Sequence, residues 1–179
     1  MRYFKLVKIV LPIIIISVFL LFTLHLNPII ASQTIQLTNN NVSDISPLIS
    51  GNKIAWINFD GNDYEIFYFD GVNTFQLTNN NTEDWLTDMD ESGIVWHGTV
   101  PKVFYGNVYQ IFLFRFSDNQ LIQLTDDTNS NMFPSISNGQ ITWISSGVKF
   151  FNGETIIKLS DYLNGGTKPY VHNQRVVWA

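Results

Sequence analysis

The stretch QLTNNNVSDISPLISGNKIAW, residues 36–56, decides the fold because it recurs along the chain. Further copies begin at Gln76 and Gln123, and a divergent fourth copy begins at Lys158. The copies end on Trp56, Trp96, Trp143 and Trp178. The second-position leucines and the final tryptophans are separated by the same three intervals, 40, 47 and 35 positions. Two residue types that keep one spacing indicate an internal structural repeat.

Each repeat unit has the pattern of four short strands. In the first unit the expected strands are residues 47–49, 53–59, 65–69 and 74–78, which are rich in β-branched and aromatic side chains. Asp60-Gly61 and Asp70-Gly71 stand between them and are hairpin turn signals, because such turns require positive φ. No long helical period follows Ser32. The unit is therefore predicted to be a four-stranded antiparallel meander.

A recurrent four-stranded unit of about 40 residues has the size of a propeller blade. The sequence resembles the TolB-like β-propeller repeat family over residues 34–179. In the first unit the resemblance is carried by Leu37, Thr38, Asp44, Pro47, Gly51, Ile54, Ala55, Trp56, Asp60, Gly61, Asp63, Glu65, Ile66, Phe67, Asp70 and Gly71. The second unit lacks the proline and the Asp-Gly turn, and Asn131 replaces the aspartate in the third. The resemblance implies an all-β propeller, but not a role in a Tol-type envelope complex.

About three and a half blades fit into residues 33–179, against about four for the smallest ring. We therefore expect a partial propeller, the fragment or truncated product of a longer one. The alternative is an open or self-associating array of blades. Size-exclusion chromatography separates these expectations, because a sharply melting monomer of this length would argue against a fragment.

An apolar segment precedes the repeats. Arg2, Lys5 and Lys8 stand before the uncharged run of residues 9–24. A basic flank followed by an apolar stretch is typical of a secretory signal or of an N-terminal membrane anchor. Residues 1–32 are therefore predicted to be an apolar export helix, either cleaved near Ala31 or retained. In both cases the repeats are extracytoplasmic, and this segment alone contacts the membrane.

The composition excludes several classes of function. The chain has 179 residues, no cysteine, 14% charged residues and a formal net charge of −5. Nucleic acid is not expected as a partner, because phosphate binding depends on clustered Lys and Arg. Without cysteine there are no disulfides, thiolate zinc sites or cysteine nucleophiles.

The polar clusters favour structural roles over chemical ones. Asp60, Asn62, Asp63 and Glu65 stand together, as do Asp127, Asn129 and Asn131. Neither set has the spacing of an EF-hand loop, so both are interpreted as turn-capping groups. Asp44 and Asp84 are expected to form hydrogen bonds between blades, and His97 and His172 stand isolated. No catalytic residue, cofactor or metal ligand is therefore predicted.

Two features remain as candidates for ligand contact. Trp85 lies outside the repeated tryptophan register and is expected in a loop, as a contact residue or as packing between blades. The second unit also carries an insertion around residues 99–107, which predicts a longer loop of the kind that repeat proteins use for specificity.

These features favour a non-enzymatic extracytoplasmic binding or scaffold module for a protein or glycan partner. The alternative is the propeller part of a larger secreted enzyme, either a peptidase-associated propeller or a polysaccharide lyase, whose catalytic portion is missing from these residues.

Overall fold

The structure is a computed structural model that describes residues 34–161 and 167–179. The chain divides into two units, Met1–Gln36 and Leu37–Ala179, and the strands of the described residues lie in the second. The predicted export helix, residues 1–32, lies outside the described residues. Among the residues that are described, no helix is long and apolar enough to span a bilayer.

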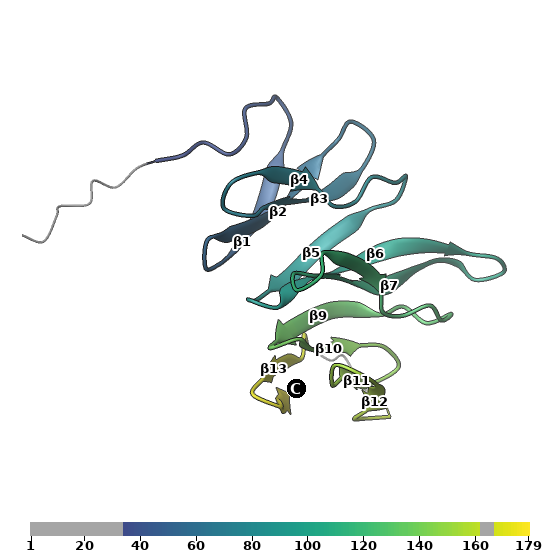
Figure 1. Cartoon of the computed structure of the whole chain (residues 1–179). Coiled ribbons are helices and arrows are strands. Elements are labelled where there is room, and N and C mark those ends of the chain that lie inside the picture. The colour runs from purple at the N-terminus through teal and green to yellow at the C-terminus, as the bar shows by residue number, and fades with distance from the viewer. Residues whose placement is uncertain (1–33, 162–166) are drawn as a thin grey trace, which may run out of the picture. The chain divides into compact units, whose positions relative to one another are not determined.

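The second unit is all-β and consists of four antiparallel sheets (Figure 1). Its strands are β1 (Asp44–Ser50), β2 (Lys53–Phe59), β3 (Tyr64–Phe69), β4 (Thr74–Gln76), β5 (Asp84–Met89), β6 (Gly93–Lys102), β7 (Gly106–Arg115), β8 (Gln120–Gln123), β9 (Met132–Ser137), β10 (Gln140–Ile144), β11 (Val148–Phe151), β12 (Ile156–Lys158), β13 (Tyr170–His172) and β14 (Arg175–Val177). The first, second and third sheets are the meanders β1–β4, β5–β8 and β9–β12, and β13 pairs with β14 in the fourth. The predicted four-stranded antiparallel units are confirmed.

Consecutive sheets pack face to face through their apolar side chains. One buried cluster joins Ile57 and Ile66 of the first sheet to Ile94 and Trp96 of the second. Another joins the second sheet to the third around Ile111 and Trp143. The fourth sheet contacts the third through β13 and β9. Since each sheet buries apolar residues against its neighbour, the stack of sheets is the core of the unit.

One hydrogen bond is repeated in the first three sheets. The indole N–H of each repeat tryptophan donates to a side-chain oxygen twelve positions earlier: Trp56 to Asp44 at 3.0 Å, Trp96 to Asp84 at 2.9 Å, and Trp143 to Asn131 at 2.9 Å. This bond lets a buried indole satisfy its donor. It also explains why Asn131 can replace aspartate, since either side chain supplies an acceptor oxygen. Within the described residues, the Asp44 carboxylate accepts hydrogen bonds from Trp56 and Asn58, which both lie in the first sheet. The expectation that Asp44 links two blades is therefore wrong.

Three of the four repeat tryptophans belong to the core. Trp56, Trp96 and Trp143 are buried, whereas Trp178 is 42% exposed. Trp178 follows β14, and the two-stranded fourth sheet provides no third strand to cover it. The same sequence position is therefore a core residue only where a complete meander surrounds it.

The sheets are also joined by buried polar side chains, at two joints that occupy equivalent positions. In the first joint Glu65 of β3 accepts a hydrogen bond from the Asn80 backbone N–H at 2.6 Å and lies beside Asp84. Burial, together with the nearby Glu65 charge, raises the pKa of Asp84 to about 7. In the second joint Gln110 of β7 receives a hydrogen bond from Asn131 at 3.3 Å. One joint thus pairs two carboxyl groups and the other pairs two amides.

Replacing Gln110 with leucine tests the second joint. The Gln110 amide is fully buried and donates to the backbone carbonyls of Asp127 at 3.0 Å and Asn129 at 3.1 Å. Gln110→Leu keeps the approximate volume but leaves these carbonyls without their donor, so we expect a loss of about 2 kcal/mol in the free energy of unfolding. Urea denaturation measures this loss. Asn79→Leu, in the exposed link between β4 and β5, is the control and should change stability far less.

Candidate functional site

The edge of the sheets that carries the β2–β3 and β6–β7 turns has a groove of about 440 Å³. Asn62 and Asp63 line it from the β2–β3 turn, and residues 81–83 line it from the link between the first two sheets. Thr99 and residues 107–109 line it from the β6–β7 hairpin. Most of these side chains are polar, so the groove suits a ligand that forms hydrogen bonds.

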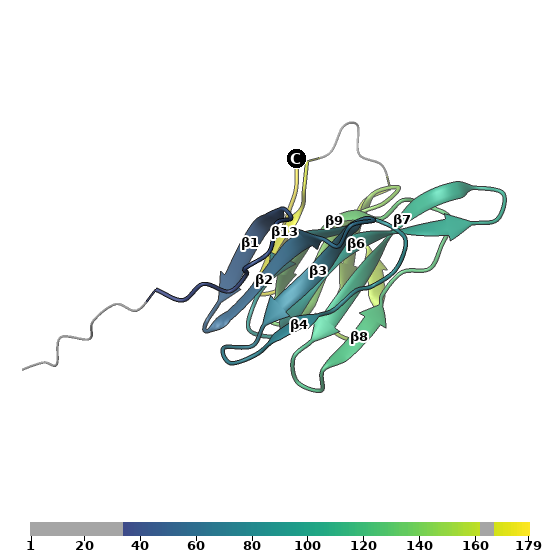
Figure 2. The same ribbon diagram turned by 90° about the horizontal axis from the view of Figure 1, so that it is seen from above.

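The β6–β7 hairpin extends beyond this groove as an arm, residues 99–107 (Figure 2). We expected a longer loop here, but the structure shows that most of the insertion lengthens two paired strands. The register continues from Thr99 opposite Tyr109 to Lys102 opposite Gly106. Lys102 also forms an ion pair with Asp126. The arm is therefore held by backbone pairing and an ion pair, unlike an unstructured loop.

The tip of the arm exposes three consecutive apolar or aromatic side chains, Val103, Phe104 and Tyr105. Phe104 is 98% exposed and has a φ of 77°, a conformation that bulky residues seldom adopt. An exposed aromatic residue in strained backbone contributes nothing to the core, and such features are concentrated at contact sites. The spacing of the repeats indicates the insertion but not these side chains. Their signal in the sequence is the run of three apolar or aromatic residues, Val103, Phe104 and Tyr105, within the insertion.

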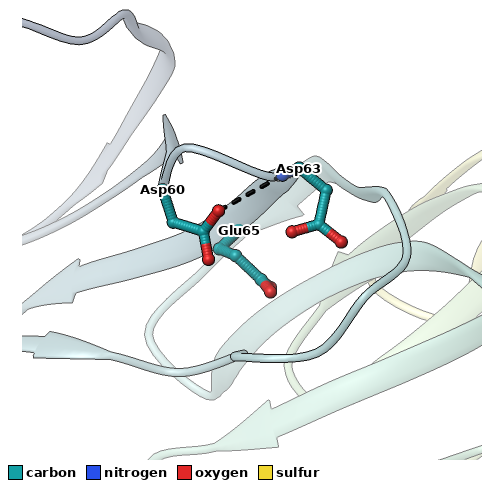
Figure 3. Close-up of side chains that lie close together, drawn as sticks. All are labelled: Asp60, Asp63 and Glu65. Carbon is teal, nitrogen blue, oxygen red and sulfur yellow. Dashed lines mark hydrogen bonds between the residues drawn. The ribbon is translucent and has the colours of Figure 1, made fainter.

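The acidic side chains of the β2–β3 turn form a compact cluster beside the groove. Asp60, Asp63 and Glu65 place one carboxylate oxygen each within 4.8 Å of one another (Figure 3). Asp60 caps the turn, accepting hydrogen bonds from the backbone N–H groups of Asn62 at 2.8 Å and Asp63 at 3.2 Å. The predicted capping role is thus confirmed for Asp60.

The second polar set, Asp127, Asn129 and Asn131, is occupied by internal hydrogen bonds. Asp127 accepts from the Asn129 backbone at 2.9 Å and from the Asn131 amide at 3.0 Å. Asn131 in turn accepts from Trp143. The predicted turn-capping role therefore holds for this set.

Trp85 lies in strand β5, and its predicted place in a loop is wrong. Its ring packs on that of Tyr64 in the first sheet, with 5.5 Å between the centroids. The reason is that the first strand of this unit begins at Asp84. The repeat pattern had placed its start three residues later, at Thr87, where the first unit has Pro47. Trp85 is half-buried and does not line the groove, so its position resembles packing between sheets more than a free contact surface.

His97 is buried among aromatic rings and does not itself line the groove. Its ring meets those of Tyr109 and Phe133 edge-on, and Nδ1 lies 3.3 Å from the Thr87 hydroxyl. Burial, with a smaller effect of the Lys168 charge, lowers its pKa to about 4. The His172 ring forms a side-chain hydrogen bond with Asn173. The side-chain hydrogen-bond partners of the two histidines in the described part of the chain are thus Thr87 and Asn173, neither of which is a carboxylate.

Comparisons with known proteins find no matching family model and no matching curated protein. Among solved structures the chain is similar to that of Pyrococcus horikoshii acylaminoacyl peptidase (orthorhombic crystal form), at 14% sequence identity and a TM-score of 0.51. The match covers 74% of this chain and 23% of the peptidase chain. At this identity the likeness concerns the fold alone.

Proposed function

We propose that the stacked sheets are blades of a β-propeller and that they form a non-enzymatic extracytoplasmic binding or scaffold module. The repeated tryptophan hydrogen bond and the face-to-face packing of successive meanders support the propeller. The resemblance to TolB-like repeats supports it independently. The partner is a protein or a glycan, contacted at the groove and the arm.

The exposed tip of the arm carries this proposal. Phe104 and Tyr105 lie in the short turn that joins the paired strands β6 and β7, so the strands present two aromatic rings at the end of the arm. Aromatic residues dominate the energetics of protein interfaces and also stack on sugar rings. Below them, the polar groove offers hydrogen-bond partners to the same ligand.

A second candidate is the propeller part of a larger secreted enzyme, as a peptidase-associated propeller or a polysaccharide lyase. The likeness to a peptidase structure that is several times longer than the matched region favours it. Sequencing the coding region beyond the Ala179 codon tests this candidate. A peptidase or lyase domain in frame would support it over the first proposal.

The double variant Phe104→Ser, Tyr105→Ser tests the binding proposal. Binding of the full-length protein is measured on a glycan array and against purified envelope proteins of the producing cell. We expect at least one ligand to bind the parent chain and to lose about tenfold or more in affinity for the variant, because two exposed rings contribute roughly 1–3 kcal/mol at a contact. The melting temperature should stay unchanged, since neither ring is in the core.

The matched control is Val72→Ser, which removes an exposed apolar side chain from the β3–β4 turn at the opposite edge of the first sheet. Equal loss of binding in this control and in the tip variant would contradict a specific role for the arm.

Trp85 as a contact residue stays a prediction. Trp85→Phe tests it, because a phenyl ring preserves packing on Tyr64 while changing any surface contact.

A further inference from the structure

Within the described residues, three buried carboxylate oxygens at the β2–β3 turn, two of Asp63 and one of Glu65, have no hydrogen-bond partner. We propose that Asp60, Asp63 and Glu65 bind a calcium ion at this turn. This inference goes beyond the proposed binding function, because it concerns the acidic β2–β3 turn at the side of the groove and not the aromatic tip of the arm.

Burial without partners is the first observation that carries the proposal. Asp63 is 4% exposed and Glu65 is fully buried, yet both carboxylate oxygens of Asp63 and Oε2 of Glu65 have no hydrogen-bond partner. An unpaired buried carboxylate is very unfavourable unless it is neutralised or bound to a cation. The unpartnered side chains converge on the same small volume as Asp60 (Figure 3).

The second sheet provides an internal comparison. By strand pairing, Glu65 corresponds to Gln110, and Asp63 corresponds to Val108. Both of these residues are buried as well, but Val108 has no polar side-chain atom and Gln110 is fully hydrogen-bonded through its amide. The fold therefore does not require acids at these positions. The β2–β3 hairpin carries charged side chains at the two positions where the β6–β7 hairpin carries neutral ones.

Turn capping does not account for the cluster. Asp70 caps the next turn of the first sheet through hydrogen bonds to Val72 and Asn73, both at 2.7 Å. It does so alone, without a second or third acid. Asp60 performs the same task in its own turn, which leaves Asp63 and Glu65 unexplained.

No cation of the protein neutralises these acids within the described residues. The ion pairs found there are Lys102–Asp126, Arg115–Asp118 and Lys158–Asp161, all outside the turn. Glu83 adds a further acid nearby, since its carboxylate accepts a hydrogen bond from the Tyr64 backbone at 3.3 Å. The local excess of negative charge therefore attracts a cation from solvent.

The ligand set favours calcium over other cations. Carboxylate oxygens are hard ligands, which suit Ca²⁺ and Mg²⁺ better than transition metals. Calcium binds oxygens at about 2.3–2.6 Å, so ligands on opposite sides of one ion are up to about 5 Å apart, in keeping with the cluster. The two free oxygens of Asp63 permit bidentate binding, which calcium accepts readily. Asp63 also lines the groove, through which an ion and its remaining water ligands can enter.

Calorimetric titration of the full-length chain with CaCl₂ is the direct test. We expect one site with a dissociation constant on the order of 10⁻⁴–10⁻³ M, as in extracellular calcium modules. About 10 mM CaCl₂ should raise the melting temperature by roughly 3–8 °C relative to EDTA. Equal concentrations of MgCl₂ should give a smaller shift.

Glu65→Gln and Asp63→Asn should weaken calcium binding by about tenfold or more and remove the calcium-dependent shift in melting temperature. In EDTA both variants should be at least as stable as the parent chain, because they remove an uncompensated buried charge. Glu65→Gln is expected to fold, since the second sheet has glutamine at the equivalent position.

Asp70→Asn is the matched control, because it changes a half-buried turn-capping aspartate outside the cluster and should leave calcium binding unchanged. Two results would overturn the proposal: no heat of binding together with identical melting temperatures in CaCl₂ and EDTA, or calcium binding that Glu65→Gln and Asp63→Asn leave intact.

Discussion

Trp96→Ala is expected to lower the free energy of unfolding by about 3–5 kcal/mol, the usual range for removing a fully buried tryptophan. Trp96 is 0% exposed and belongs to the apolar cluster between the first and second sheets. Its ring also stacks on Phe112, with centroids 5.7 Å apart. Because small domains are stable by only about 5–15 kcal/mol, this one change should remove a large part of the total. Urea denaturation followed by tryptophan fluorescence and circular dichroism measures it.

The chain contains its own control for this experiment. Trp178 has the same repeat position but is 42% exposed, so Trp178→Ala should cost less than about 1 kcal/mol. Similar losses for Trp96→Ala and Trp178→Ala would contradict the interpretation that the tryptophan acts as core.

Trp96→Phe separates packing from hydrogen bonding. The phenyl ring fills most of the space but cannot donate to Asp84, which is buried, so an intermediate loss of about 1–3 kcal/mol is expected. A loss near zero would show that the repeated indole hydrogen bond contributes nothing measurable.

Much of the fold could be predicted because the same weak strand and turn signals recur in each repeat unit, and together they indicate one structure. One copy of KIAWINF indicates a strand only weakly, but a tryptophan that returns in register in each unit defines its second strand. The turn signals Asp60-Gly61 and Asp70-Gly71 then place the neighbouring strands, and the pairing of β2 with β3 and of β3 with β4 agrees with them.

Predictions failed where one copy departs from the repeat. Trp85 was expected in a loop because the second unit lacks the proline that marks the first strand of the other units, yet backbone pairing with His97 extends the strand to include it. The insertion of residues 99–107 was expected as a loop because the variation in length among the units is confined to this hairpin. Local patterns do not reveal that an inserted segment continues a ladder of backbone hydrogen bonds.

The candidate sites were harder to predict, because they depend on burial that spacing does not reveal. The sequence shows four polar side chains close together, Asp60, Asn62, Asp63 and Glu65, and such residues are ordinary in a turn. Only the packing of the second sheet makes Asp63 and Glu65 buried and leaves their oxygens without partners. His97 is similar: it has no neighbouring motif, and its altered chemistry comes from rings and a lysine that are distant in the sequence.

Lowering the pH from 7 to 5 is expected to remove a stabilising contribution that the neutral His97 ring makes to the fold. Its pKa is near 4 in the folded chain and near 6.5 when unfolded, so below pH 6.5 the unfolded state takes up a proton that the folded state does not. The stability contributed by the neutral ring is fully present above pH 6.5 and is lost as the pH falls toward 4. These two pKa values give a loss of about 2 kcal/mol at pH 5 and about 3 kcal/mol at pH 4.

His97→Phe removes this titration while retaining an aromatic ring between Tyr109 and Phe133. Asp84 has a raised pKa and acts in the opposite direction, but it is the same in both proteins, so the difference between their pH profiles isolates His97. We expect the variant to lose roughly 6 °C less in melting temperature than the parent chain between pH 7 and pH 5. His172→Gln, which changes an exposed histidine, should follow the parent profile. Parallel profiles for the parent chain and His97→Phe would instead mean that His97 has the same pKa in the folded and the unfolded chain, because a ring that titrates equally in both states cannot make stability depend on pH.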